Sequence, residues 1–262
     1  MKKIFKVLIS FFVIGLIFTV LFVGNAIFGN PISKFIVSKN AQKYVEETYA
    51  DKDYYIDRIG YDFKTNGYYV FVKSNSSIDT YFSVGYDIFG NEGNDSYTSR
   101  VLDGFNTWHR INLEYRDMVD TVIDKLRYDS DINYGEIQTI DKYSDDIVYG
   151  LNINDLELDK KYDIKDMGAK HGKIVLYIYT DEINVQNASD ILLEIKEISN
   201  QNDLCFYAID LVLRKPINDD KKEWEDRESI RIEDFLYSDI LKDGLIEKIN
   251  NNISNSQNLY LK

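Results

Sequence analysis

The stretch YYIDRIGYDFKTNGYYVFVKSNSSIDTYFSVGYDI, Tyr54–Ile88, predicts three antiparallel strands. Residues 54–63 and 67–73 are rich in Tyr, Val, Ile and Phe, and the turn between them contains Asn66-Gly67, a pair that suits a tight hairpin. Residues 80–88 alternate in polarity, and one face of this strand carries Thr80, Phe82, Val84, Tyr86 and Ile88. A small sheet of this kind packs one face against helices.

Helices are expected directly before and after these strands. Apolar residues recur at helical spacing to about residue 49, and Asn30-Pro31 fits the N-cap and the first helical position. Residues 90–95 are interpreted as a loop, and a long helical stripe runs from Val101 to Leu126. Residues 30–128 are therefore predicted to form a unit with the order α-β-β-β-α.

The N-terminal segment is predicted to be a transmembrane helix over residues 7–28, preceded by a cytoplasmic tail of residues 1–6. Fourteen of the seventeen residues of 7–23 are Val, Leu, Ile or Phe, which favours the bilayer by about 4 to 8 kcal/mol. A helix over residues 7–28 spans about 33 Å, which matches a hydrocarbon core of about 30 Å. A cleaved signal peptide, with Gly24-Asn25-Ala26 before the cut, and a buried soluble helix are the alternatives. A signal peptide is disfavoured because its apolar region usually runs 7–15 residues.

Charge predicts the orientation and excludes several classes of protein. Lysines at positions 2, 3 and 6 favour a cytoplasmic N-terminus at the cell membrane, with the chain after about residue 30 outside the cytoplasm. That part has 28 basic and 44 acidic residues, a net charge of −16, within a whole-chain charge of −13. Nucleic-acid binding is excluded because it needs a basic surface, and the single Cys excludes a disulfide scaffold.

The second half is predicted to form another α+β unit over residues 129–262. Strands are expected at 134–140, 147–153, 173–179, 205–213 and 229–235, and helices at 188–198 and 240–253. Residues 218–227 read as a charged loop, and 254–262 as a polar tail. The predicted fold class is α+β, with one N-terminal transmembrane helix followed by two small units of antiparallel sheet and helix.

Three segments resemble a known family. They are GNPISK at 29–34, AQKYVEETYADKDYYIDRIGYDFKTNGYYVFVKSNSSIDTYF at 41–82, and YGLNINDLELDKKYDIKDMGAKHGKIVLYI at 149–178. Together they resemble the YfjL-like proteins of low-GC Gram-positive bacteria, and the similarity extends over most of the chain after residue 28. The resemblance implies a single-pass, membrane-anchored, extracytoplasmic α+β protein. It supplies no reaction and no catalytic residue.

Residues that could carry chemistry are few. His109 follows Trp108 on a helix and His171 lies in a turn before a strand, and neither has a Ser or Cys at a telling spacing, so both are expected at the surface or in packing. Gly168 and Gly172-Lys173 resemble a phosphate loop, but the spacing is one residue short. Cys205, inside an apolar strand, is expected to be a buried inert thiol. No catalytic or cofactor-binding residue is assigned.

One segment has part of a calcium-loop pattern. Asp129, Asp131 and Asn133 place oxygen ligands at alternate positions. A calcium loop also needs Gly at its sixth position and Glu at its twelfth, and those positions hold Tyr134 and Ile140. The segment is therefore interpreted as a polar connection, and no metal site is assigned.

The leading hypothesis is a non-enzymatic, membrane-tethered binding or accessory module outside the cytoplasm, without a cofactor. Its partner is expected to be a protein, a peptide or a cell-wall component. One alternative is a cell-envelope hydrolase that uses carboxylates, His109 or His171. Another is an inhibitory or assembly module for a neighbouring membrane protein.

Overall fold

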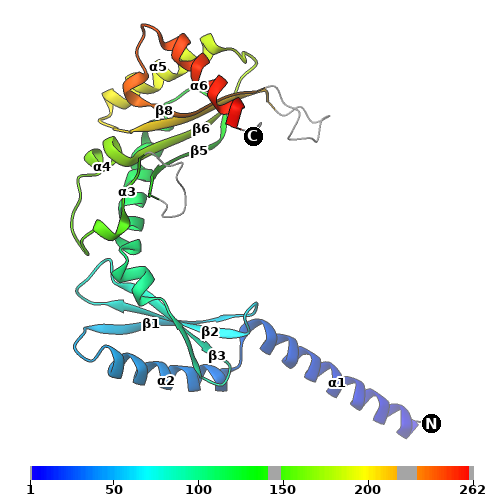
Figure 1. Ribbon diagram of the computed structural model, residues 1–262. Coiled ribbons are helices and arrows are strands. Elements are labelled where there is room, and N and C mark those ends of the chain that lie inside the picture. Colours follow the sequence, from blue (N-terminus) through cyan, green and yellow to red (C-terminus); the bar gives the residue numbers. More distant parts are fainter. Residues whose placement is uncertain (1, 141–148, 217–228, 260–262) are drawn as a thin grey trace. The chain divides into compact units, whose positions relative to one another are not determined.

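A computed structural model describes residues 2–140, 149–216 and 229–259 (Figure 1). The expected loop at 218–227 lies outside these residues, and so do the first two residues of the expected strand at 147–153. The strand prediction is wrong for the other five, which hold only an isolated bridge from Leu151 to Thr139 and the start of a 3-10 turn. The chain divides into two compact units. Unit 1 comprises Met1–Asn106 with Glu157–Asp159, and unit 2 comprises Thr107–Leu156 with Lys160–Lys262. Each unit holds one four-stranded sheet with helices, which confirms the predicted α+β class.

The first helix, α1 (Lys2–Phe28), has 27 residues and an apolar surface. Its described large apolar side chains, from Phe5 to Phe28, are exposed, and none of the described residues in its most apolar part is buried within the protein. Within the described ranges it is the one helix that is long and apolar enough to cross a membrane.

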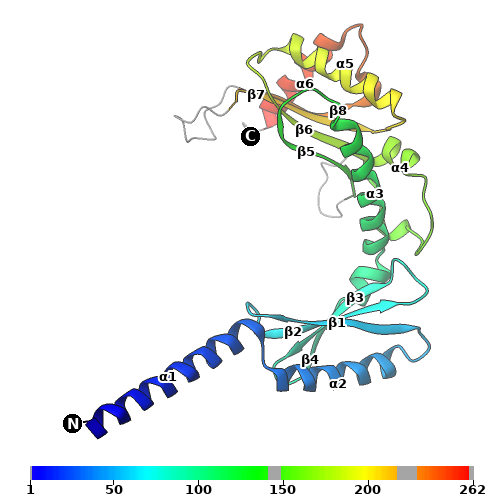
Figure 2. The same ribbon diagram turned by 180° about the vertical axis from the view of Figure 1, so that it is seen from behind.

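Unit 1 pairs one helix with an antiparallel sheet. Its strands β1 (Tyr54–Asp62), β2 (Gly67–Ser74), β3 (Tyr81–Asp87) and β4 (Glu92–Asp95) lie side by side in that order. Helix α2 (Pro31–Thr48) lies along one face of the sheet (Figures 1 and 2). The core between them is formed by Val37, Ala41, Val45, Tyr68, Val70, Val72, Phe82, Val84 and Tyr86.

The expected loop at 90–95 is wrong in part, because β4 pairs with β3 there. This strand lies at the edge of the sheet and is mostly exposed, so it needs no alternating apolar pattern and gives none. A short π-helical turn, Thr98–Leu102, follows it.

Helix α3 (Phe105–Ile123) carries the long apolar stripe, but its buried side chains belong to the core of unit 2. Ile111, Tyr115 and Val119 are fully buried there. The predicted unit over residues 30–128 places this helix with the first sheet instead. Periodicity identifies the face of a helix that is buried but does not say which sheet covers that face.

Unit 2 has a mixed sheet. The strands β5 (Ser130–Ile137), β6 (Gly172–Tyr179), β7 (Ala208–Arg214) and β8 (Ser229–Leu236) lie in that order. The pairs β5–β6 and β7–β8 are antiparallel, but β6 and β7 are parallel. The expectation of an antiparallel sheet is wrong at this pair, because α5 (Val185–Gln201) connects the two strands as a crossover helix.

The remaining helices of unit 2 are α4 (Ile164–His171) and α6 (Leu245–Leu259), with short 3-10 turns at Ile153–Asp155 and Tyr237–Asp239. Helices α5 and α6 lie over the same face of the sheet (Figure 2). Helix α4 stands where a turn was expected. Its N-cap is Asp163, whose side chain accepts hydrogen bonds from the amides of Lys165 and Asp166.

Candidate functional site

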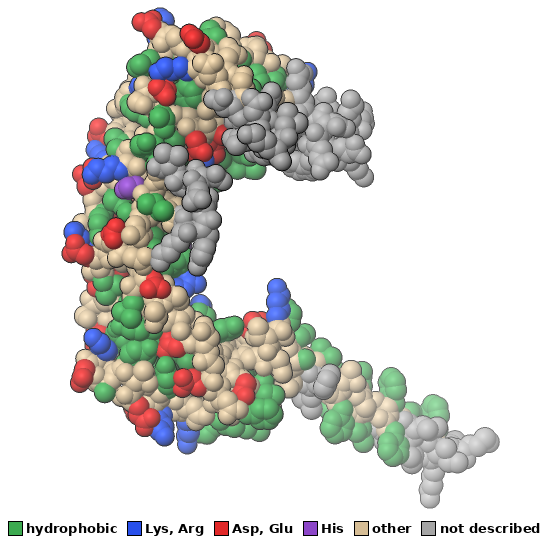
Figure 3. Space-filling model, in the orientation of Figure 1, with side chains coloured by type: hydrophobic (Ala, Val, Ile, Leu, Met, Phe, Trp, Pro, Cys, Tyr) green, Lys and Arg blue, Asp and Glu red, His purple; other side chains and the backbone are tan. Residues whose placement is uncertain are grey.

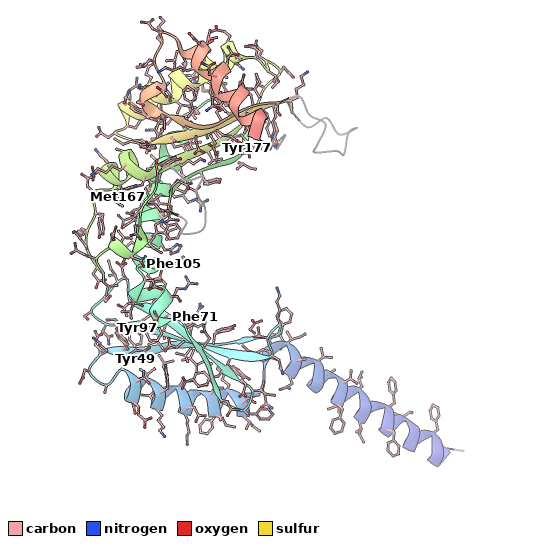
Figure 4. All side chains as sticks on the ribbon, viewed as in Figure 1. Tyr49, Phe71, Tyr97, Phe105, Met167 and Tyr177 are labelled. Carbon is pink, nitrogen blue, oxygen red and sulfur yellow. The ribbon has the colours of Figure 1, made fainter. Side chains whose placement is uncertain are left out.

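The face of the first sheet that points away from α2 is the candidate site, here called the open face. Strand register places its residues in three rows across β1, β2 and β3. The rows are Tyr55–Lys73–Tyr81, Arg58–Phe71–Ser83 and Gly60–Tyr69–Gly85. Phe71 projects from the side of the sheet away from α2 (Figure 4). One face therefore carries four aromatic rings, two glycines, and the side chains of Arg58, Lys73 and Ser83.

The open face is accessible and shallow. Tyr55 and Tyr69 are 40% and 37% exposed, so both rings are accessible to a partner. Gly60 and Gly85 lie on either side of Tyr69, so no neighbouring side chain in its row rises beside its ring. A groove of about 450 Å³ crosses the other two rows, between Lys73 and Ser83.

The charge of the open face is opposite in sign to that of the chain. The guanidinium of Arg58 lies 4.2 Å from the ring centre of Phe71, and that of Arg100, at the edge of the groove, lies 4.5 Å from the ring centre of Phe105. Lys73 forms an ion pair of 3.1 Å with Asp57. The groove is thus lined by three cationic side chains and one carboxylate.

The two arginines are prepared to bind an anion. Within the described part of the chain neither Arg58 nor Arg100 forms an ion pair. A guanidinium held over an aromatic ring by a cation–π contact can still donate its N–H groups, and their geometry matches a carboxylate or a phosphate. Burial raises the pKa of the nearby Tyr81, while the charge of Arg100 opposes that rise.

An aromatic cluster supports the sheet from the α2 side. The ring of Tyr49 lies between 5.0 and 6.1 Å from those of Tyr44, Tyr54, Phe82 and Tyr97. The carboxylate of Asp95 accepts hydrogen bonds from the hydroxyls of Tyr44, at 2.7 Å, and Tyr49, at 2.8 Å. Burial raises the pKa of both hydroxyls well above 10, and Asp95 raises it further. Much of the tyrosine content of unit 1 is thus packing.

A polar cluster lies on the second sheet, on the face away from α5. Lys173 Nζ lies 2.8 Å from Asp210 Oδ2 and 2.8 Å from Asp234 Oδ1. Tyr149 donates its hydroxyl to Asp234 at 2.9 Å, and the Asp234 amide donates to Asp210 at 2.7 Å. Burial raises the pKa of Asp210 although Lys173 opposes this. Every charged group in the cluster has a partner of opposite sign, so none of the three charges is left unpaired.

The two histidines belong to unit 2, whereas the open face belongs to unit 1. His109 is half-buried on α3, with its ring centre 6.5 Å from that of Trp108. His171 is half-buried at the end of α4, and burial and then the charge of Lys170 lower its pKa. Neither belongs to the three rows or to the groove of unit 1.

The glycines that resemble a phosphate loop have a packing role. Gly168 lies within α4 and Gly172 begins β6. A Cβ atom would lie 2.7 Å from Tyr115 Cε2 at Gly168, and 2.6 Å from Tyr115 Cζ at Gly172. The ring of Tyr115 therefore fills the space that these glycines leave. Cys205 is half-buried and precedes β7, whereas a fully buried position inside the strand was expected.

The segment with the partial calcium pattern is extended. Asp129 comes directly before β5, which begins at Ser130 and includes Asn133. Alternate residues of a strand recur about 6.6 Å apart along its axis, whereas a calcium loop curls around one ion. Among the described residues no group of three or more His, Cys, Asp or Glu could hold a metal ion.

The open face is not predicted by the sequence patterns. The sequence contains Arg58, Gly60 and Gly85, but polar or apolar side chains could also occupy these positions. These three residues therefore do not by themselves indicate a binding face. Only the register across β1, β2 and β3 shows that these residues lie beside Tyr69 and Phe71.

Two family models match the chain. Residues 1–94 match the model described as YfjL-like, N-terminal domain, and residues 114–250 match the model described as YfjL-like C-terminal domain. The first match includes all three rows of the open face, and the second includes the sheet of unit 2. No curated protein and no solved structure matches the chain significantly.

Proposed function

The chain belongs to the YfjL-like family, and we propose that it is a membrane-tethered binding module, not an enzyme. Helix α1 is the anchor in the cell membrane, and both units lie outside the cytoplasm. The length and apolar surface of α1 support the anchor, and the three N-terminal lysines support the orientation.

The open face is the binding surface in this proposal, and its partner carries acidic groups. The observation that carries the proposal is the pair of ring-stacked arginines, Arg58 and Arg100, beside an exposed aromatic surface. Aromatic and arginine side chains are the residue types most often found at the centres of protein interfaces. The chain has a net charge of −13, so the cationic side chains of the open face stand out from a surface that is acidic on average and attract an acidic partner to this face.

A binding role fits the polar groups better than the hydrolase alternative. Catalysis by paired carboxylates needs one carboxyl group that is free to donate a proton and another that is ionised, on either side of a substrate. The carboxylates of the polar cluster around Lys173 are instead paired with its ammonium group.

Site-specific photo-crosslinking in whole cells tests this proposal. The photoreactive amino acid benzoylphenylalanine replaces Tyr69 on the open face or, as a control, Leu113 in unit 2, which is also exposed. We expect a discrete crosslinked product from Tyr69 and not from Leu113. The product should be lost in the Arg58→Glu, Arg100→Glu double variant, because reversed charge repels an acidic partner.

The same cells test the anchor and its orientation. Protease added outside, after removal of the wall, should cut both units, and the chain should stay with membranes through carbonate washing. Equal crosslinking from the two positions, or a product that survives the charge reversal, would contradict a binding role for the open face. Turnover of a wall substrate by the purified chain would favour the hydrolase instead.

A further inference from the structure

We propose that the end of unit 1 next to α1 is a membrane-contact surface that enters the interfacial region of the bilayer. This proposal rests on the proposed anchoring of α1. Five large apolar side chains at this end are between 59% and 80% exposed. They form a set that we call the apolar collar: Phe28, Ile32, Phe35, Phe63 and Phe89.

Strand register brings two collar residues to the same end of the sheet. Phe63 lies in the turn that follows Asp62, and Asp62 pairs with Gly67 where the β1–β2 hairpin closes. Gly67 in turn pairs with Asp87, after which the chain turns through Phe89. The two turns that carry Phe63 and Phe89 are therefore neighbours.

Helix α1 meets unit 1 at this same end. The hydroxyl of Tyr68, next to Gly67, accepts from the amide of Asn30 at 2.8 Å and donates to its carbonyl at 2.9 Å. The side chain of Asn40 in α2 donates to the carbonyl of Gly90 at 2.8 Å, beside Phe89. Phe28 and the first two turns of α2, which carry Ile32 and Phe35, are thereby placed next to the two turns.

Exposed apolar side chains lie on both sides of the junction between α1 and unit 1. Hydrophobic side chains lie along α1 and again at the adjoining end of unit 1 (Figure 3). A phenylalanine at the tip of a polar turn is costly in water and favourable at a lipid interface. Because two residues separate α1 from α2, a bilayer that holds α1 meets the collar directly.

Lysines complete the pattern of an interfacial surface. Lys34, Lys39 and Lys64 are exposed within or next to the collar, and the ammonium group of Lys39 lies 4.9 Å from the ring centre of Phe35. Such side chains bury their apolar stems and keep their charges among anionic headgroups. The occupant that fits both the phenylalanines and the lysines is therefore a lipid surface.

Brominated lipids test this contact in the full-length chain. The chain is reconstituted into vesicles that contain brominated acyl chains, and Trp replaces Phe63, Phe89 or Ile78. Ile78 is the matched control, because it is 67% exposed but lies in the β2–β3 turn, at the opposite end of the sheet. The unsubstituted chain, with Trp108 and Trp224, sets the background.

We expect bromine quenching of F63W and F89W to exceed that of I78W by at least twofold, with emission shifted to the blue. Equal quenching in the three variants, with the chain retained in the vesicles, would overturn the membrane-contact surface and leave the anchor intact. A blue shift without quenching would overturn it too, because a protein partner or a second copy then covers the collar. Release of the chain by carbonate would overturn the anchor and the contact surface together.

Discussion

The hydroxyl of Tyr68 and the backbone of Asn30 form two hydrogen bonds with each other, one in each direction. Because 38 residues separate them, this contact ties the start of α2 to the second strand of the sheet. Gly29, just before it, has a φ of +77°, and a Cβ atom there would lie 2.7 Å from Tyr61 and Tyr68. The junction therefore depends on glycine, on asparagine as the N-cap and on a buried tyrosine together.

We expect Tyr68→Phe to lower the stability of unit 1 by about 1–3 kcal/mol. The Asn30 carbonyl keeps a bond from the Lys34 amide, so the main loss is at the Asn30 amide, which is left without its acceptor. Among the amides of unit 1, that of Asn30 should show the earliest increase in its rate of hydrogen exchange. Tyr61→Phe is the control, because its hydroxyl bonds only to the exposed side chain of Asn66 and should change stability by less than about 0.5 kcal/mol. Similar losses in both variants would contradict this role.

Unit 1 should lose stability above about pH 10. Burial, then hydrogen bonding to Asp95, raises the pKa of Tyr44 and Tyr49 above the ordinary value near 10. A raised pKa in the folded state gives stability that is complete below the unfolded pKa and is lost as pH rises above it. Absorbance at 295 nm should show these tyrosines ionising only as the unit unfolds. In Asp95→Asn the fall in stability from pH 9 to pH 11 should be smaller, and an unchanged fall would contradict the assignment.

The ion pair between Lys173 and Asp210 should matter much more than one of equal length at the surface. Its side chains are 14% and 20% exposed, so Lys173→Met leaves a shielded carboxylate and should cost about 3 kcal/mol in the unfolding of unit 2. Lys165 and Asp203 also lie 2.8 Å apart but are 50% and 77% exposed, and Lys165→Met should cost less than about 1 kcal/mol. Denaturant unfolding measures both. Equal costs for the two substitutions would contradict the role assigned to burial.

Gly168→Ala should destabilise unit 2 although it improves helix propensity. Alanine in the interior of α4 would by itself gain up to about 1 kcal/mol. The new methyl group would instead clash with the backbone carbonyl of Cys205 and with the ring of Tyr115, and such overpacking of the core costs about 1–3 kcal/mol. The sign of the change in melting temperature therefore separates the two effects. A rise would show that the space beside Tyr115 can accommodate a methyl group.

The elements that could be predicted from the sequence are those in which each face keeps the same surroundings along the whole length of the element. Residues 80–88 alternate because one side packs on α2, and the strand is confirmed as β3. The apolar run at 173–179 is confirmed as β6, whose side chains are buried on one face and half-buried or buried on the other. The periodicity of a segment reflects its local surroundings, so it can be recognised in the sequence.

The elements that were missed depend on distant residues. The edge strand β4 exists because β3 offers it hydrogen bonds, and α4 packs its glycine against Tyr115 from α3. The parallel pairing of β6 and β7 follows from the crossover through α5, which strand patterns alone do not specify. The open face needed register for the same reason, since Arg58 and Phe71 are paired only across two strands.

Gly29 and Asn30 are the whole connection between α1 and α2. A flexible linker of twenty residues would have let unit 1 sample a radius of about 25 Å around its point of attachment. With α1 in a bilayer, this unit has almost no such freedom, so it cannot search the surrounding space for a ligand. Whatever it binds has to arrive at the membrane surface, which selects for molecules that are themselves held there or pass close to it.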